Sequence, residues 1–303
     1  MVTVGAPVAW GLASAAMIAA YGVPTSHAFV FAWLAVGMAS FAVTDLRRKF
    51  ARFVIDWLPF MGVLLIYDRL RAFADGLIVH ARELPQVRIE AAVFGKPIPT
   101  VWLQNHLWHG VGDLRWYDYA AWFVYLTHFV VTLSVAAILW TWAHHHFARF
   151  ATMVCVLALT AFATYVLYPA VPPWMAAQHG AIGEAHRTVK LVWPHVPVAH
   201  YGNFFASGTA EHYGNNVAAI PSLHAAYALL VVLFFWKLSP WWVRPLLALY
   251  PPAMAFSLVY GGEHYVVDCI AGWAYAAFAY FSVEFVFARR AARRAYLEPA
   301  LVD

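Results

Sequence analysis

Long apolar stretches, separated by short polar connections, follow one another along the whole chain. Eight of them approach the roughly 20 residues that a helix needs to cross the hydrocarbon core of a membrane. The third is the most polar, because it contains Asp56 and ends in Asp68, Arg69 and Arg71. The pattern predicts an all-α integral membrane protein with about eight spans, near residues 7–23, 27–44, 53–73, 117–140, 150–169, 218–238, 241–260 and 265–287.

The composition excludes an ordinary soluble protein. Hydrophobic residues make up 63% of the 303 residues and charged residues only 11%, against roughly 45–50% and 25% in a typical soluble domain. The first apolar stretch has no basic segment before it and no clear small-residue cleavage site, so we expect a span and not a removable signal peptide. Cys155 and Cys269 both fall inside predicted spans, without the spacing of a disulfide framework or a zinc site.

Basic residues gather in the short connections that follow the second, fourth, sixth and eighth spans. With eight spans these connections all lie on one side of the membrane, and the positive-inside rule makes that side cytoplasmic. We therefore expect a multi-pass plasma membrane protein with both termini in the cytoplasm and the long connections 74–116 and 170–217 outside. The net charge of +4 is explained by this topology and does not indicate a nucleic-acid partner. The basic residues concerned are Arg47, Arg48, Lys49, Arg52, Arg149, Lys237, Arg244, Arg289, Arg290, Arg293 and Arg294.

Two histidines lie at the predicted outer ends of spans. His224 follows a Pro-Ser pair, and His264 stands four positions before Asp268, so that on a helix these two side chains share one face. Asp268 can accept a hydrogen bond from one ring nitrogen of His264, which leaves the other nitrogen to attack an electrophile. His224 can then protonate the departing oxygen. The alternative interpretation is a structural pair that only pins helices together.

Two motifs around these histidines resemble signatures of the phosphatidic acid phosphatase type 2 superfamily. They are PSLH at 221–224 and SLVYGGEHYVVD at 257–268. Leu223 stands where the first signature has glycine, and Leu258 stands where the second has arginine. The spacing between Ser257, His264 and Asp268 is retained.

The resemblance implies a six-helix catalytic core over residues 53–288, preceded by two additional spans in residues 1–52 and followed by a basic tail, 289–303. It also implies that His264 is the nucleophile that becomes phosphorylated and that His224 protonates the leaving group. No metal and no cofactor are implied. The active site would face the extracytoplasmic side.

A further signature of the superfamily, a lysine followed seven residues later by Arg-Pro, has no counterpart in YVLYPAVPPW at 165–174. The PPW ending, the PSLHAA form and the absent arginines are more similar to the branch of inositol phosphorylceramide and sphingomyelin synthases. That branch implies transfer of inositol phosphate or a similar polyol phosphate from a membrane phospholipid to a lipid, glycolipid or polyol acceptor. A lipid phosphate or polyprenyl diphosphate phosphatase is the first alternative, and a non-catalytic lipid-binding or transport protein is the second.

Another cation must then neutralise the phosphate, because charge that develops on its oxygens needs preorganised donors. Arg69 and Arg71, at the outer end of the third span, are the first candidates, and Asp68 can pair with either. Ser222 and Tyr265, beside the two histidines, complete the predicted substrate-binding set, and Glu263 is near enough to His264 to bind a polyol hydroxyl. The outer connections hold the alternative cations Arg115, Arg187 and Lys190. We interpret the aromatic-rich segment 86–116 as an interfacial or re-entrant helix.

Overall fold

The computed structural model describes residues 5–21, 27–41, 46–74, 81–196 and 218–297. In these ranges the regular structure is helical, apart from two isolated β-bridges. The prediction of an all-helical chain is therefore confirmed. The longer helices are α1 (Gly5–Tyr21), α2 (His27–Phe41), α3 (Leu46–Ala74), α6 (Trp116–Trp142), α7 (His144–Leu167), α11 (Leu223–Trp236), α12 (Arg244–Tyr260) and α13 (Val266–Leu297).

Each of the eight predicted spans coincides with one of these helices. Within the described part of the chain, three helices are long and apolar enough to cross a membrane, over Trp116–Trp142, His144–Leu167 and Val266–Tyr296. Two shorter apolar helices cover Val8–Ala20 and Leu223–Trp236. The chain is thus a membrane protein with several candidate spans, whereas the number eight, the orientation and the division at residues 52 and 288 stay predictions.

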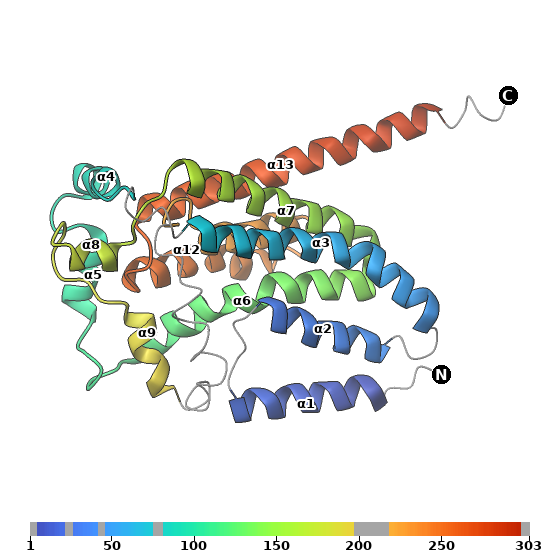
Figure 1. Ribbon diagram of the computed structural model, residues 1–303, viewed down its shortest axis with the longest axis horizontal. Helices are drawn as coiled ribbons and strands as arrows, with labels where there is room; N and C mark the ends of the chain where they lie inside the picture. The colour runs from blue at the N-terminus through green and yellow to red at the C-terminus, as the bar shows by residue number, and fades with distance from the viewer. Residues whose placement is uncertain (1–4, 22–26, 42–45, 75–80, 197–217, 298–303) are drawn as a thin grey trace.

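The helices form a bundle in which α11 packs against both α12 and α13, α7 packs against α3 and α13, and α6 packs against α7 and α12. Small residues let them approach closely: Ala158, Ala226, Ala276 and Ala279 are fully buried in the largest apolar cluster. Alanine and glycine at crossing points are typical of helix packing in membranes. In Figure 1 the helices α1 and α2 lie at one edge, and the last turns of α13 project beyond the bundle.

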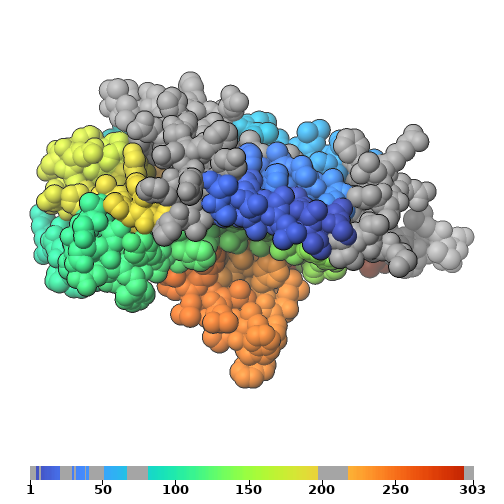
Figure 2. All heavy atoms as spheres, turned by 90° about the horizontal axis from the view of Figure 1, so that it is seen from below, coloured from blue at the N-terminus to red at the C-terminus, as the bar shows by residue number. Residues whose placement is uncertain are grey.

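The outward surface of the bundle remains apolar. Figure 2 shows the orange part of the chain, which includes α12, standing out from the rest of the molecule. Its most exposed large side chains are Trp241, Trp242, Leu246 and Leu249, which are between 61% and 79% exposed. An apolar patch of this kind marks a surface that contacts lipid or another protein.

Short helices gather at one end of the bundle (Figure 1). They come from the two long connections. Segment 86–116 is partly helical, and its interfacial or re-entrant position stays a prediction. Residues 168–174 contact three separate segments. Ala170 forms parallel β-bridges with Arg82 and with Ala218, and the Trp174 amide donates a hydrogen bond to the Gly262 carbonyl at 3.0 Å. The helices of this end are α4 (Leu84–Phe94), α5 (Pro99–Leu107), α8 (Pro173–Gln178), α9 (Thr188–Val192) and the 3-10 turn η2 (Trp193–His195).

Candidate active site

The first turn of α11 carries His224, and Ser222 caps that turn. The Ser222 hydroxyl accepts from the Ala225 amide at 3.4 Å, while the Ser222 amide donates to the Asp268 carbonyl at 2.9 Å. A Cβ atom added to Gly272 would lie only 2.2 Å from the Ser222 carbonyl oxygen, so only glycine allows this approach. The start of α11 is therefore held against the first turns of α13.

His264 lies in the tight connection between α12 and α13. The amides of Glu263 and His264 both donate to the Leu258 carbonyl, at 3.0 Å and 3.3 Å. Gly262 has φ of +71°, and a Cβ atom there would lie 2.4 Å from the His186 carbonyl oxygen. The left-handed turn and the close backbone contact both require glycine at this position.

The tautomer of His264 follows from its hydrogen bond. Its Nδ1 atom lies 2.8 Å from the carbonyl oxygen of Ala219. A carbonyl can only accept, so Nδ1 carries the proton and Nε2 of the neutral ring carries the lone pair. His264 is buried, with 7% of its surface exposed, and is therefore held in one orientation.

Asp268 lies behind this ring, but in a different arrangement from the expected one. Its Oδ2 atom accepts from the Tyr265 amide at 2.9 Å and lies 3.6 Å from Nδ1 of His264. The carboxylate caps α13 because a residue in the third helical position reaches back to the amide of the residue that precedes the helix. Ala219 thus takes the hydrogen bond, and the carboxyl group of Asp268 lies close to the ring.

The two histidines lie side by side, with ring centroids 5.6 Å apart. Helix α6 forms a wall against His224: the ring of Tyr125 stacks on it at 5.0 Å, and the ring of His128 lies at 3.8 Å. Phe129 contacts it edge-on at 6.1 Å. His128 was not predicted as a site residue, although a lone imidazole inside an apolar span is a signal for a functional residue.

The position where the superfamily has an arginine lies in the apolar core. Leu258 is fully buried and packs with Ala225, Met254 and Cys269. The neighbouring Ser257 hydroxyl donates to the Ala121 carbonyl of α6. Nothing cationic occupies this position, so a phosphate group needs its counter-charge from another part of the chain.

Arg187, in the loop between α8 and α9, contacts the connection between α12 and α13. Its Nε and Nη2 atoms donate to the two carboxylate oxygens of Glu263 at 2.8 Å and 3.0 Å, and its Cζ atom lies 4.8 Å from the ring centroid of Trp174. Burial on its own disfavours the guanidinium charge, but the Glu263 carboxylate outweighs it and raises the pKa of Arg187. The cation therefore stays charged beside Glu263, the residue that precedes His264 in the chain.

Gln104 of α5 fixes the loop that carries Arg187. Its amide nitrogen donates to the carbonyls of His186 and Tyr260, at 2.9 Å and 2.7 Å, and its amide oxygen accepts from the His186 amide at 2.7 Å. Gln104 is only 4% exposed. Three hydrogen bonds of this buried side-chain amide therefore join the loop to Tyr260 at the end of α12, four residues before His264.

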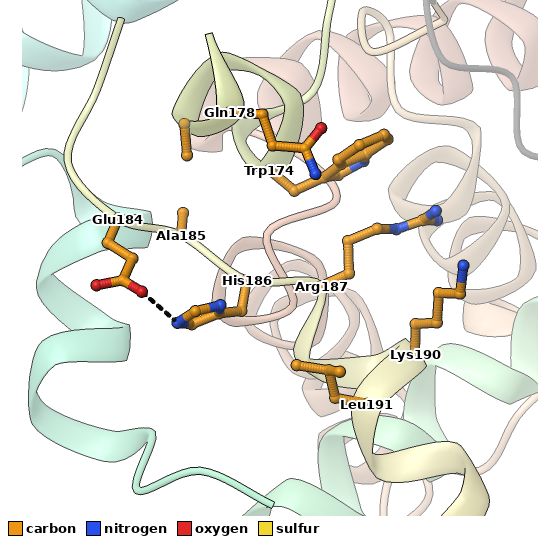
Figure 3. A pocket seen from close by; sticks show the side chains of 9 residues that line it. Trp174, Gln178, Glu184, Ala185, His186, Arg187, Lys190 and Leu191 are labelled. Atoms are coloured by element: carbon orange, nitrogen blue, oxygen red, sulfur yellow. Dashed lines mark ion pairs between the residues drawn. The ribbon is translucent and has the colours of Figure 1, made fainter. Parts of the chain in front are cut away.

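A cavity of about 700 Å³ opens beside Arg187 (Figure 3). Arg187 and Lys190 extend to one side of it, and Glu184 and His186 pair at the other with 3.3 Å between Oε1 and Nε2. It lies within the size range of small-molecule sites. Its lining consists of Trp174, Ala177, Gln178, Glu184, Ala185, His186, Arg187, Lys190 and Leu191.

The other residues predicted to bind substrate do not share one location. Asp68, Arg69 and Arg71 belong to α3, but their side chains lie outside the described residues. Arg115 forms an exposed ion pair with Asp113 at 2.6 Å. Ser222 and Tyr265 are fully buried, and the ring of Tyr265 packs against Ile98 and Val101, so their predicted contact with substrate stays a prediction.

Comparison with known proteins agrees with these motifs. No solved structure matches the chain. The phosphoinositol dihydroceramide synthase of Bacteroides thetaiotaomicron is 27% identical over 131 residues, an alignment that covers 42% of this chain and 42% of the relative. The chain thus matches less than half the length of that relative. The sequence model of the PAP2 superfamily, the phosphatidic acid phosphatase type 2 superfamily, matches residues 100–282, which is more than half of the chain. The chain therefore belongs to the PAP2 superfamily.

Proposed function

We propose that this protein is a lipid phosphotransferase that carries a phospho-alcohol headgroup on His264. The observation that supports it most directly is the hydrogen bond from Nδ1 of His264 to Ala219, with the ring of His224 5.6 Å away. This tautomer presents the Nε2 lone pair as a nucleophile, and the second imidazole is close enough to exchange a proton with the leaving group.

The proposed reaction has two halves. Nε2 of His264 bonds to phosphorus while the bond between phosphorus and the donor lipid oxygen breaks, and His224 gives its proton to that oxygen. The Asp268 carboxylate, 3.6 Å from Nδ1, stabilises the positive charge on the His264 ring. In the second half His224 takes a proton from the acceptor hydroxyl, whose oxygen bonds to phosphorus as the bond to His264 breaks.

Transfer to a lipid, and not to water, is supported by the surroundings of His224. Tyr125, His128 and Phe129 place rings against it, and an enclosed apolar site limits hydrolysis of a reactive intermediate. The name of the Bacteroides relative, phosphoinositol dihydroceramide synthase, supports inositol phosphate as the headgroup. The basic connections support a plasma membrane location with the site on the extracytoplasmic side.

The test is a product assay with the purified protein in nanodiscs. Phosphatidylinositol labelled in its inositol ring is supplied with and without a ceramide acceptor, and products are identified by mass spectrometry. We expect a phosphoinositol adduct of the acceptor that is lost in His264→Ala and in His224→Ala. His106→Ala, which changes an exposed histidine of α5 bonded to Trp102, should retain it.

The outcomes separate the candidate reactions. An adduct that persists in His264→Ala contradicts the phosphohistidine intermediate. Labelled inositol phosphate alone, whatever acceptor is present, means that water is the acceptor and that the protein is a hydrolase. Absence of any labelled product favours a non-catalytic protein.

A further inference from the structure

Two residues that line the cavity, Arg187 and Trp174, contact the connection that holds His264. Arg187 is bound to Glu263, the residue before His264, through two hydrogen bonds. Trp174, whose ring centroid lies 4.8 Å from Cζ of Arg187, donates its backbone amide to the Gly262 carbonyl at 3.0 Å. The cavity wall is therefore attached to the turn that carries the proposed nucleophile.

The walls of the cavity offer three kinds of contact. Arg187 and Lys190 are three positions apart and extend to the same side (Figure 3), where two cations suit a phosphate group. The Glu184 carboxylate, at the other side, and the Gln178 amide, beside Trp174, can hydrogen-bond with hydroxyl groups. The ring of Trp174, which lies 4.8 Å from Cζ of Arg187, adds an apolar surface beside the cations.

Arg187 has donors to spare for a ligand. A guanidinium carries five N–H donors, and Glu263 takes one on Nε and one on Nη2. A phosphate can therefore bind to the remaining donors while Glu263 still holds the side chain in place. A held guanidinium loses less conformational freedom on binding than a mobile one.

This chemistry selects among headgroups. A choline headgroup is recognised by an aromatic cage around its quaternary ammonium, and two cations on one wall repel it. A phosphate attached to a ring of hydroxyls satisfies both sides of the cavity at once. Because Leu258 occupies the position of the superfamily arginine in the apolar core, the phosphate needs a cation from elsewhere, and Arg187 is in place to provide it.

We infer that this cavity is the headgroup site, that it takes a phosphorylated polyol, and that Arg187 with Lys190 neutralises the phosphate. The inference rests on the proposed function, since it names the substrate class of the same site. The shared chemistry has two sources, the headgroup of a membrane lipid and the free polyol phosphate.

The first experiment measures binding without turnover. His264→Ala protein in phosphatidylcholine nanodiscs is titrated by calorimetry with myo-inositol 1-phosphate, with myo-inositol and with inorganic phosphate. We expect binding of myo-inositol 1-phosphate that Arg187→Gln weakens at least tenfold and Lys190→Gln about threefold, because a charge-assisted contact is stronger when it is partly buried. Arg88→Gln, which changes an exposed arginine of α4, is the matched control and should change nothing.

Two further arms identify the ligand. If phosphatidylinositol added to the nanodiscs competes with the soluble probe, the lipid headgroup occupies the cavity; if it does not, the free polyol phosphate is the ligand. Binding of inorganic phosphate as tightly as myo-inositol 1-phosphate overturns the polyol part of the inference. Arg187→Lys, which retains the charge, should recover part of the affinity and thereby separate loss of charge from loss of loop structure.

The inference and the proposed function fail in different ways. If transfer depends on His264 while Arg187→Gln and Lys190→Gln leave the probe affinity and the KM for the donor unchanged, the inference is wrong and the function stands. If the unmodified protein yields no product while probe binding depends on Arg187, the function is wrong and the cavity remains a polyol phosphate site.

Discussion

Replacing Glu90 by glutamine should change how the stability of the protein depends on pH. Glu90 lies on α4 and is fully buried, and its Oε1 atom accepts from the Val267 amide at 2.9 Å, at the start of α13. Burial raises the pKa of Glu90 to about 7; the hydrogen bond from Val267 opposes this shift and the Asp268 carboxylate adds to it. Glutamine retains the accepting oxygen and cannot ionise.

The size of the effect follows from the two pKa values. Between pH 4.5 and about 7 the folded protein holds a proton that the unfolded chain has lost, so the free energy of unfolding falls as pH rises across this window. At 1.36 kcal/mol per unit, a shift of roughly 2.5 units corresponds to about 3 kcal/mol. The stabilising contribution of Glu90 is complete below pH 4.5 and lost above about pH 7.

The assay is thermal unfolding in detergent at steps between pH 5 and 8, followed by tryptophan fluorescence. We expect the melting temperature of the unmodified protein to fall relative to that of Glu90→Gln as pH rises through this range. Asp113→Asn changes an exposed carboxylate in the same connection, 74–116. Its melting temperature should depend on pH as that of the unmodified protein does. Parallel pH profiles for Glu90→Gln and the unmodified protein would refute the reasoning, since Glu90 would then titrate alike in both states.

Three other changes test the site. Gly272→Ala should cost about 1–3 kcal/mol of stability, because its Cβ atom meets the Ser222 carbonyl at 2.2 Å and overpacking carries that penalty; a melting temperature unchanged in detergent contradicts it. His128→Phe fills the same space beside His224 without a polar atom and should lower kcat about tenfold, or 1.4 kcal/mol, at constant KM in the nanodisc assay; a change in KM alone contradicts it. Gln104→Leu should release the Arg187 loop and raise the KM for the donor with little effect on kcat, which donor titration measures.

The positions of the helices could be predicted from apolar runs, but several of their ends could not. Helix α7 begins at His144, six residues before the predicted span, because HHHFAR is polar and yet forms helix. Hydropathy reports compatibility with lipid, whereas backbone hydrogen bonding decides where a helix begins. Pro221 has the opposite effect: α11 begins at Leu223 although the apolar run starts at 218, since the residue before proline is disfavoured in helix.

The proximity of the proposed catalytic groups was partly predictable from spacing. The four-residue separation placed His264 near Asp268, and two helix ends on one membrane side suggested that His224 joins them. The Ala219 carbonyl that accepts from His264 was not predictable, because a backbone acceptor leaves no mark in the residue types. For the same reason the sequence favoured Asp268 as the hydrogen-bond partner.

The cation shows the limit of local patterns most clearly. Arg187 and Glu263 are 76 residues apart, and nothing near Arg187 distinguishes it from Arg115 or Lys190 until Gln104 is seen to fix its loop. The arrangement separates two tasks. In the proposed function His224 stands at the start of α11, which Ser222 and Gly272 hold against α13, whereas the phosphate is neutralised from the loop that carries Arg187. We therefore expect exchange of residues 184–190 between relatives to change headgroup preference while His264 remains essential.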